Sequence, residues 1–289
     1  MSHPVFVIGK NRSGTKWLTN TIASHENFCC VQREGANGVV ETNILRQMPR
    51  AFGSLKDEEN HVGFVECFSE TNFFKLTGIP KEFLYNLNAD SYTQVLSQVM
   101  KKYSRKKRWT HKFSPHVVQK IVNKFPKAKL IFIYRNCVEN VKSSIGLENL
   151  KDKSEKRSVM RHLLSYVYQV KSMKKYSDRK NVMEVNFVDL KKSKKKLCKE
   201  ISEFVGVKFS KKMLKERYDK NTSYISDVKK EEVLSTKEEN ILKITKIIVD
   251  KLPLTTLKVM NKVKNLLRDD FEKKRFVPKT FEIRRKEVK

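Results

Sequence analysis

The chain lacks a long apolar run. No apolar segment among its 289 residues approaches the ~18 residues that a membrane-spanning helix needs, so no membrane span is expected. An apolar strand candidate begins directly after Pro4, which leaves no room for a signal peptide ahead of it. We therefore expect a soluble, cytoplasmic protein, or a catalytic domain without its anchor.

Cysteine is scarce, and its spacing fits neither a disulfide framework nor a metal site. The five cysteines are an odd number, and they do not follow the spacing of metal ligands. No cluster of histidine, cysteine and aspartate indicates a metal site either. We expect reduced thiols and no bound metal.

Acidic residues are few relative to basic ones. The chain has 62 Lys and Arg against 32 Asp and Glu, for a formal net charge of +30. Such an excess raises the local concentration of anions and steers acidic partners toward the protein. Zinc-finger, homeodomain and RNA-recognition signatures are missing, so a specific nucleic-acid ligand is not expected. An acidic polymer is the partner class that the charge favours.

The apolar pattern predicts strands alternating with helices. Buried strands are expected at 5–8, 130–134 and 182–187, with a weaker candidate at 108–113. Helical stripes lie between them, and this alternation is typical of a three-layer α/β fold with a mainly parallel sheet covered by helices on both faces. Helical segments are expected at 15–24, 96–103, 115–125, 159–168, 197–205, 237–251 and 257–271.

The chain divides by composition. Residues 1–218 read as the α/β domain, and residues 219–289 as a basic helical extension packed on that domain or trailing from it. The segment 35–90 mixes Phe, Gly and Pro with little periodicity, and we expect the acceptor pocket there.

The first strand runs into a loop suited to an anion. Gly9, four residues, Gly14, Thr15 and Lys16 nearly reproduce a Walker A loop, but Thr and Lys are exchanged. A loop that binds Mg-ATP needs its Lys directly after the second Gly, whereas this chain places a cation before it, at Arg12. Backbone N–H groups at a helix N-terminus and the helix dipole favour a phosphate-like anion at this position.

Four motifs in order resemble those of the sulfotransferases that use 3′-phosphoadenosine 5′-phosphosulfate (PAPS). Residues 12–17, Arg-Ser-Gly-Thr-Lys-Trp, are similar to the family's 5′-phosphosulfate loop. Residues 129–143 resemble its 3′-phosphate motif, in which an apolar strand ends in Arg and a Ser follows eight residues later. Weaker likenesses are Lys112 with Pro115, and the segments 185–190 and 201–206. The motifs are closest to the tyrosylprotein and carbohydrate types.

The resemblance implies a P-loop-like strand–loop–helix, PAPS as co-substrate and no required metal. By that likeness Arg12 is a catalytic cation on the bridging side, and Lys112 reaches the transferring group. Arg135 and Ser143 hold the 3′-phosphate. Lys16, Phe113 and Phe187 depart from the family pattern. The expected cofactor-binding residues on the loop are Arg12, Ser13, Gly14, Thr15, Lys16 and Trp17.

The base and the acceptor are predicted with alternatives. Glu34 is the first choice for the base, because the family's tyrosylprotein and heparan types use a Glu after the first helix; His111 and Glu41 are the alternatives. The expected acceptor is a hydroxyl, or an amine, of an anionic glycan.

Two other functions stay open. A small-molecule P-loop kinase would need an Asp where Arg135 follows the second long strand. The other is a polyanion-binding protein that has lost catalysis.

Overall fold

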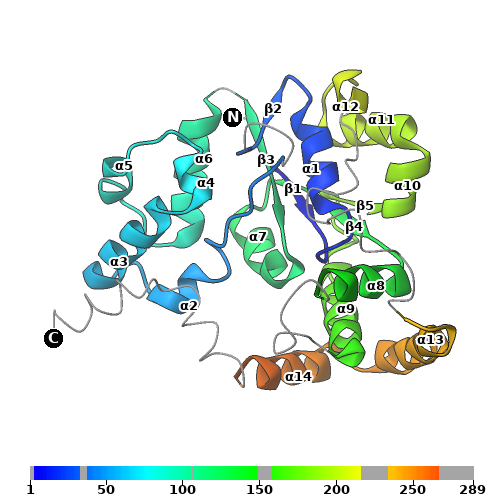
Figure 1. The fold of residues 1–289 in the computed structure, drawn as a ribbon. Helices are drawn as coiled ribbons and strands as arrows, with labels where there is room; N and C mark the ends of the chain where they lie inside the picture. The colour runs from blue at the N-terminus through cyan, green and yellow to red at the C-terminus, as the bar shows by residue number, and fades with distance from the viewer. Residues whose placement is uncertain (1–2, 33–37, 106, 149–157, 216–233, 267–289) are drawn as a thin grey trace.

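The computed structural model describes residues 3–32, 38–105, 107–148, 158–215 and 234–266. Within these ranges five parallel strands form one sheet in the order β2-β3-β1-β4-β5 (Figure 1). The strands are β1 (Val5–Ile8), β2 (Phe28–Cys29), β3 (Arg108–Phe113), β4 (Lys129–Tyr134) and β5 (Val182–Asn186). The carboxyl ends of parallel strands meet at one edge, and in such sheets ligands bind there.

Helices connect the strands and cover both faces of the sheet. The helices up to β4 are α1 (Thr15–Ala23), α2 (Met48–Phe52), α3 (Glu58–Ser69), α4 (Asn72–Lys75), α5 (Glu82–Tyr85), α6 (Tyr92–Ser104), the 3₁₀ turn η1 (Pro115–Val117) and α7 (Val118–Lys124). Those that follow are α8 (Cys137–Glu148), α9 (Val159–Lys174), α10 (Phe187–Lys192), α11 (Lys194–Val205), α12 (Lys212–Lys215), α13 (Thr236–Lys251) and α14 (Leu254–Leu266).

Alternate residues of the strands feed two separate cores. On β1, Phe6 and Ile8 pack with side chains of helices α2–α7, whereas Val5 and Val7 pack with those of α1, α10 and α11. This is the period of two expected for a strand buried on both faces. Figure 1 shows the two helical layers on opposite sides of the sheet.

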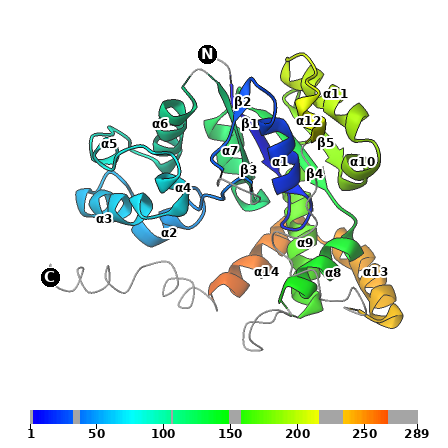
Figure 2. The ribbon, with the colours of Figure 1, turned by 45° about the horizontal axis from the view of Figure 1, so that its top comes forward.

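A third apolar cluster joins the C-terminal helices to α8 and α9. Leu163 and Val167 of α9 are buried with Val141 of α8 and with Leu242 and Val249 of α13. In Figures 1 and 2, α13 and α14 lie on either side of α9. The C-terminal helices therefore pack against the same helices that follow β4.

The expected fold class is confirmed, and the four expected strands are all present. The sequence missed β2, whose two residues are too short to give a pattern. β5 ends at Asn186, one residue early, because the Asn186 side chain accepts from Val188 N–H and caps α10. The segment expected to lack periodicity contains α2–α5, and only α3 among these reaches three turns.

Two further expectations, the last helix and the division of the chain, extend beyond the described residues. The last expected helix, 257–271, is observed as α14 from Leu254 to Leu266, and the remainder of 257–271 lies outside the described residues. The predicted division between residues 218 and 219 also lies outside them. Among the described helices, none has the length and apolar character needed to cross a bilayer.

Candidate active site

The loop between β1 and α1 is fixed by two backbone features. Gly14 caps α1 with φ +88°, in the left-handed region that glycine adopts without strain. A Cβ atom on Gly14 would lie 2.5 Å from Phe187 Cδ2, so the loop packs against the start of α10. Arg12 also has a positive φ, +73°, which is uncommon for a residue with a side chain. The loop thus holds a strained Arg at the carboxyl edge of the sheet, as anion- and substrate-binding loops often do.

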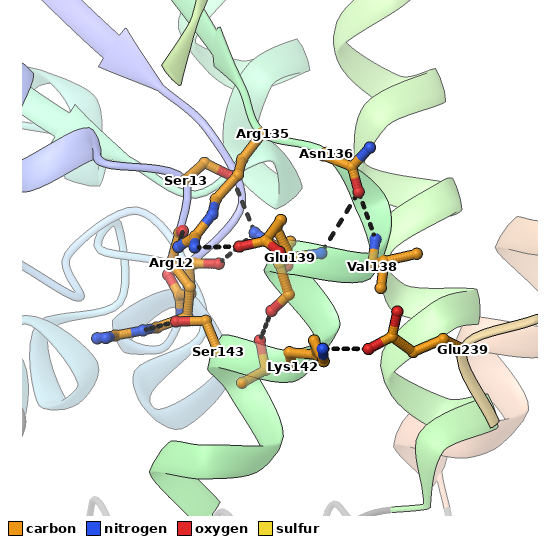
Figure 3. A network of polar contacts seen from close by, with 12 residues as sticks. Arg12, Ser13, Arg135, Asn136, Val138, Glu139, Lys142, Ser143 and Glu239 are labelled. Carbon is orange, nitrogen blue, oxygen red and sulfur yellow. Dashed lines mark hydrogen bonds and ion pairs between the residues drawn. The ribbon is translucent and has the colours of Figure 1, made fainter. Parts of the chain in front are cut away.

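Arg12 and Ser143 meet across the sheet edge. The guanidinium Nε of Arg12 donates to the Ser143 hydroxyl over 3.1 Å (Figure 3). Ser143 lies in α8, the helix that follows β4. The loop after β1 and the helix α8 after β4 therefore contribute to one polar site. The sequence motifs at 12–17 and 129–143 predicted that these two segments act together.

Arg135 lies at the junction of these two elements. Its Nη1 donates to the Arg12 carbonyl over 3.1 Å and its Nη2 to Glu139 Oε2 over 3.1 Å. Its guanidinium also stacks on Phe187, 4.9 Å from the ring centroid, while Tyr166 donates to its carbonyl over 2.7 Å. These contacts orient a cation at the end of β4, with the Glu139 carboxylate as its acidic partner.

Asn140 is a site residue that sequence reasoning missed. Its Nδ2 donates to the Asn11 carbonyl and to the Ser13 hydroxyl, both over 3.0 Å, and the side chain is fully buried. It ties the anion loop to the first turns of α8. Its position between Arg135 and Ser143 is the one sequence signal that could have identified it.

Lys112 pairs with Glu41 beside the anion loop. Lys112 Nζ donates to Glu41 Oε1, and the Lys112 side chain is only 8% exposed. Burial lowers the pKa of Lys112 despite the attraction of Glu41, and the nearby charges of Lys16 and Arg12 lower it further. Burial of Glu41 raises the pKa of its carboxyl group. The charge and hydrogen bond of Lys112, together with the charges of Lys16 and His111, lower that pKa by more, so the net effect is a lowered pKa.

His111 lies on the opposite face of β3 from Lys112, as strand alternation requires. Its ring packs edge-on to Phe113 at 4.8 Å and Phe73 at 5.5 Å between centroids. Within the described residues neither ring nitrogen has a hydrogen-bond partner. Burial, followed by the charge of Lys112, lowers the pKa of His111 to about 3, so the ring is neutral.

A small polar cavity of about 60 Å³ opens beside the Lys112–Glu41 pair. Its walls come from the anion loop, the end of β3 and the segment before α2. Beyond it, Lys120 Nζ donates to the Leu45 carbonyl over 3.2 Å, and burial together with Arg50 lowers the pKa of Lys120. The cavity is lined by Gly9, Asn11, Thr15, Glu41, Thr42, Asn43, Leu45, Arg46, Lys112, Phe113, Ser114 and Val117.

The structure brings most of the predicted site residues to one edge of the sheet. Ser13 is buried in the loop, and the first turn of α1 begins with the buried Thr15 and the exposed Lys16. Trp17 packs edge-on to Phe187, 6.2 Å between centroids. Glu34, the first-choice base, lies outside the described residues.

The chain belongs to the sulfotransferase family, because a sequence model of that family matches residues 4–211, more than half of its length. It is therefore a sulfotransferase-family enzyme. The match covers β1 to α11, and with them the anion loop, Lys112, Arg135 and Ser143. No curated protein sequence matches the chain significantly.

Solved structures share the fold at low identity. The sulfotransferase domain from the curacin biosynthetic pathway has a TM-score of 0.52 at 15% identity, covering 91% of this chain and 98% of that one. The sulfotransferase domain of the Synechococcus PCC 7002 olefin synthase has a TM-score of 0.52 at 14% identity, covering 88% and 98%. A mouse sulfotransferase complexed with PAP has a TM-score of 0.49 at 13% identity, covering 91% and 88%.

Proposed function

We propose that this enzyme transfers a sulfuryl group from PAPS to a hydroxyl, or an amine, of an anionic glycan. The observation that carries the proposal is the meeting of Arg12, Arg135 and Ser143 at the carboxyl edge of the sheet. Two groups of anion-binding side chains, far apart in sequence, lie side by side there. A nucleotide with phosphate groups on both its 3′ and 5′ positions needs such a paired site.

The donor chemistry of the loop fits the 5′ end of the nucleotide. Arg12 supplies a fork of N–H donors, Thr15 a hydroxyl, and the first turn of α1 backbone N–H groups without intrahelical acceptors. Arg135 and Ser143 would bind the 3′-phosphate, and Phe187 would keep the Arg135 guanidinium in place. Asn140 supports both groups by tying Ser13 and Asn11 to α8.

The catalytic roles follow from charge and position. When bound, PAPS supplies the sulfuryl group: the sulfur–oxygen bond to the 5′-phosphate breaks as the bond to the acceptor forms, and adenosine 3′,5′-bisphosphate leaves. Arg12 would neutralise charge on the leaving phosphate, and Lys112 charge on the transferring group. Both cations lie close enough that Arg12 lowers the pKa of Lys112.

Glu41 is the base that the geometry favours. It lines the polar cavity and touches Lys112, so its carboxylate lies beside the group that would contact the sulfuryl oxygens. When Lys112 turns to that group, Glu41 loses its cation, and its affinity for the acceptor proton rises. Glu34 remains the alternative base. His111 is a weaker proposal, because its lowered pKa makes the ring a weak base and because the ring is packed among aromatic side chains.

The cavity indicates how an acceptor would enter. Its volume of about 60 Å³ admits one hydroxyl-bearing group, so the rest of a larger acceptor would lie outside it. Thr42 and Asn43 offer hydrogen bonds to sugar hydroxyls, and Arg46 offers a cation to a neighbouring carboxylate or sulfate. Arg50 and Lys120 add positive charge nearby. These features support an acidic polysaccharide over a small neutral alcohol.

The test is transfer of radiolabelled sulfuryl from PAPS to a panel of acidic and neutral polysaccharides. We expect label in acidic polysaccharide with the wild type and at least tenfold less with Lys112→Ala. The Lys124→Ala variant, which changes an exposed lysine of α7, is the matched control and should retain activity. Label confined to neutral polysaccharides or small alcohols would contradict the acceptor class.

A further inference from the structure

Most of the exposed large apolar side chains lie on the two C-terminal helices. Among the described residues, eleven large apolar side chains are exposed, and six of them lie on α13 and α14. The other five are single residues of α3, α5, α9 and α10 and Leu76, which directly follows α4, whereas α13 alone carries four of the exposed side chains. The six are Ile241, Ile244, Ile247, Ile248, Val259 and Met260, between 42% and 61% exposed.

Helix geometry separates this face from the packed one. Leu242 and Val249, seven residues apart, are buried against α9. Ile241, Ile244 and Ile248 follow the same three-and-four spacing on a different side of the helix, so they form their own stripe. The stripe faces away from the core that holds α13 in place.

The acidic residues of α13 do not lie along its apolar stripe. Its acidic residues are engaged inward or at the helix ends: Glu239 pairs with Lys142 of α8, and Asp250 with Lys246 (Figure 3 shows the first pair). Glu238 closes the capping box with Ser235.

Lysines, by contrast, border the apolar stripe. Lys237, Lys243 and Lys251 are exposed on α13, and Lys258 is exposed on α14. The outer face therefore combines isoleucine side chains with positive charge, while the acidic groups lie elsewhere on the helix.

We propose that the isoleucine-bearing outer face of α13 docks on an anionic lipid surface. Isoleucine side chains would enter the boundary between headgroups and acyl chains, and the lysine stems would lie along the apolar layer with their ammonium groups at the headgroups. The net charge of +30 complements anionic lipids over the whole chain. Because α13 is tied to α8 by Lys142 and Glu239, docking brings the helix that carries Ser143 close to the lipid.

Vesicle co-sedimentation of the full chain tests the proposal. The probe is vesicles of phosphatidylcholine and phosphatidylserine, with pure phosphatidylcholine for comparison. The variant Ile244→Ser/Ile248→Ser keeps every charge, so electrostatic attraction alone would leave its binding unchanged. We expect its partition coefficient to fall roughly tenfold, because two apolar side chains no longer enter the lipid. The matched control, Val62→Ser/Leu76→Ser, removes an exposed apolar side chain of α3 and one directly after α4, and it should bind as the wild type does.

A second readout separates insertion from surface attraction and from self-association. With Ile248→Trp, anionic vesicles should blue-shift the added fluorescence, and brominated acyl chains should quench it. Equal vesicle binding by Ile244→Ser/Ile248→Ser and the wild type would overturn the proposal. So would an Ile248→Trp variant whose added fluorescence the vesicles leave unchanged. A wild-type dimer that the double serine variant makes monomeric, without any loss of vesicle binding, would instead assign the face to a second copy of the chain.

Discussion

The Arg12 guanidinium donates to the Ser143 hydroxyl over 3.1 Å, joining two residues that lie 131 positions apart. We predict that Ser143→Ala weakens binding of adenosine 3′,5′-bisphosphate by roughly tenfold, since a hydrogen bond to a charged group contributes about 1.5–3 kcal/mol. Isothermal titration calorimetry measures this. Ser172→Ala removes a hydroxyl that donates to the Tyr168 carbonyl in the preceding turn of α9, and this variant should bind normally. Equal affinity of Ser143→Ala and wild type would remove Ser143 from the site.

Substitutions of Arg135 and Glu139 should change the affinity for the bisphosphate in opposite directions. Arg135→Ala loses a charge-assisted contact to phosphate and should weaken bisphosphate binding by about tenfold or more. Glu139→Gln removes the carboxylate that occupies Arg135, so binding should tighten, by up to about fivefold because the exposed pair contributes at most ~1 kcal/mol. Arg161→Ala, at an exposed arginine of α9, is the control for Arg135→Ala. Weaker binding by Glu139→Gln would show that Glu139 supports the site instead of competing with the phosphate.

The Lys112–Glu41 pair sets the expected pH dependence of turnover. The pKa of Glu41 is lowered from 4.5, so the carboxylate should stay ionised until the pH falls below that value. The pKa of Lys112 is lowered from 10.5, so its positive charge should be lost before the pH reaches that value. Turnover should therefore fall on the alkaline side below pH 10.5.

Two variants test the roles of Lys112 and Glu41 in the pH dependence of turnover. Lys112→Arg cannot lose its proton in this range and should abolish the alkaline limb, with circular dichroism used to exclude unfolding. Glu41→Gln should lower turnover by about 10²–10⁴-fold, the range of one acid–base group, and leave bisphosphate affinity unchanged. If Glu34→Gln shows that loss and Glu41→Gln does not, the base is Glu34.

Gly14 should tolerate no side chain. At φ +88° an alanine is strained by about 1–2 kcal/mol, and its Cβ would also lie 2.5 Å from Phe187. Gly78 is the matched control, because it has φ +64° with nothing within 4 Å of an added Cβ. Chemical denaturation should show a larger loss of unfolding free energy for Gly14→Ala than for Gly78→Ala, and bisphosphate binding should be lost only in the first. Equal losses would mean that the loop can move away from α10.

The sequence was most informative where a pattern was long or chemically unusual. The runs 5–8 and 130–134, each followed by Arg within a few residues, predicted both central strands. The structure brings the two Arg residues together at the sheet edge, where the anion site stays a prediction. Asn140 was missed because its position between Arg135 and Ser143 does not show that the Asn11 carbonyl lies beside it. The pairing of Lys112 with Glu41 depends on how the loop before α2 crosses β3, which residue spacing does not determine.

The most direct test of the nucleotide site is a thermal-shift panel with adenosine 3′,5′-bisphosphate, adenosine 2′,5′-bisphosphate and ATP with Mg²⁺. Arg135 and Ser143 are assigned to a phosphate on the 3′ position, so the 3′,5′ isomer should raise the melting temperature most. At ~100 times its dissociation constant it should add about 2.7 kcal/mol of stability. Arg135→Ala should reduce that shift and bring the two isomers closer together. A larger shift with Mg-ATP than with the 3′,5′-bisphosphate would contradict the account and favour a phosphoryl-transfer enzyme.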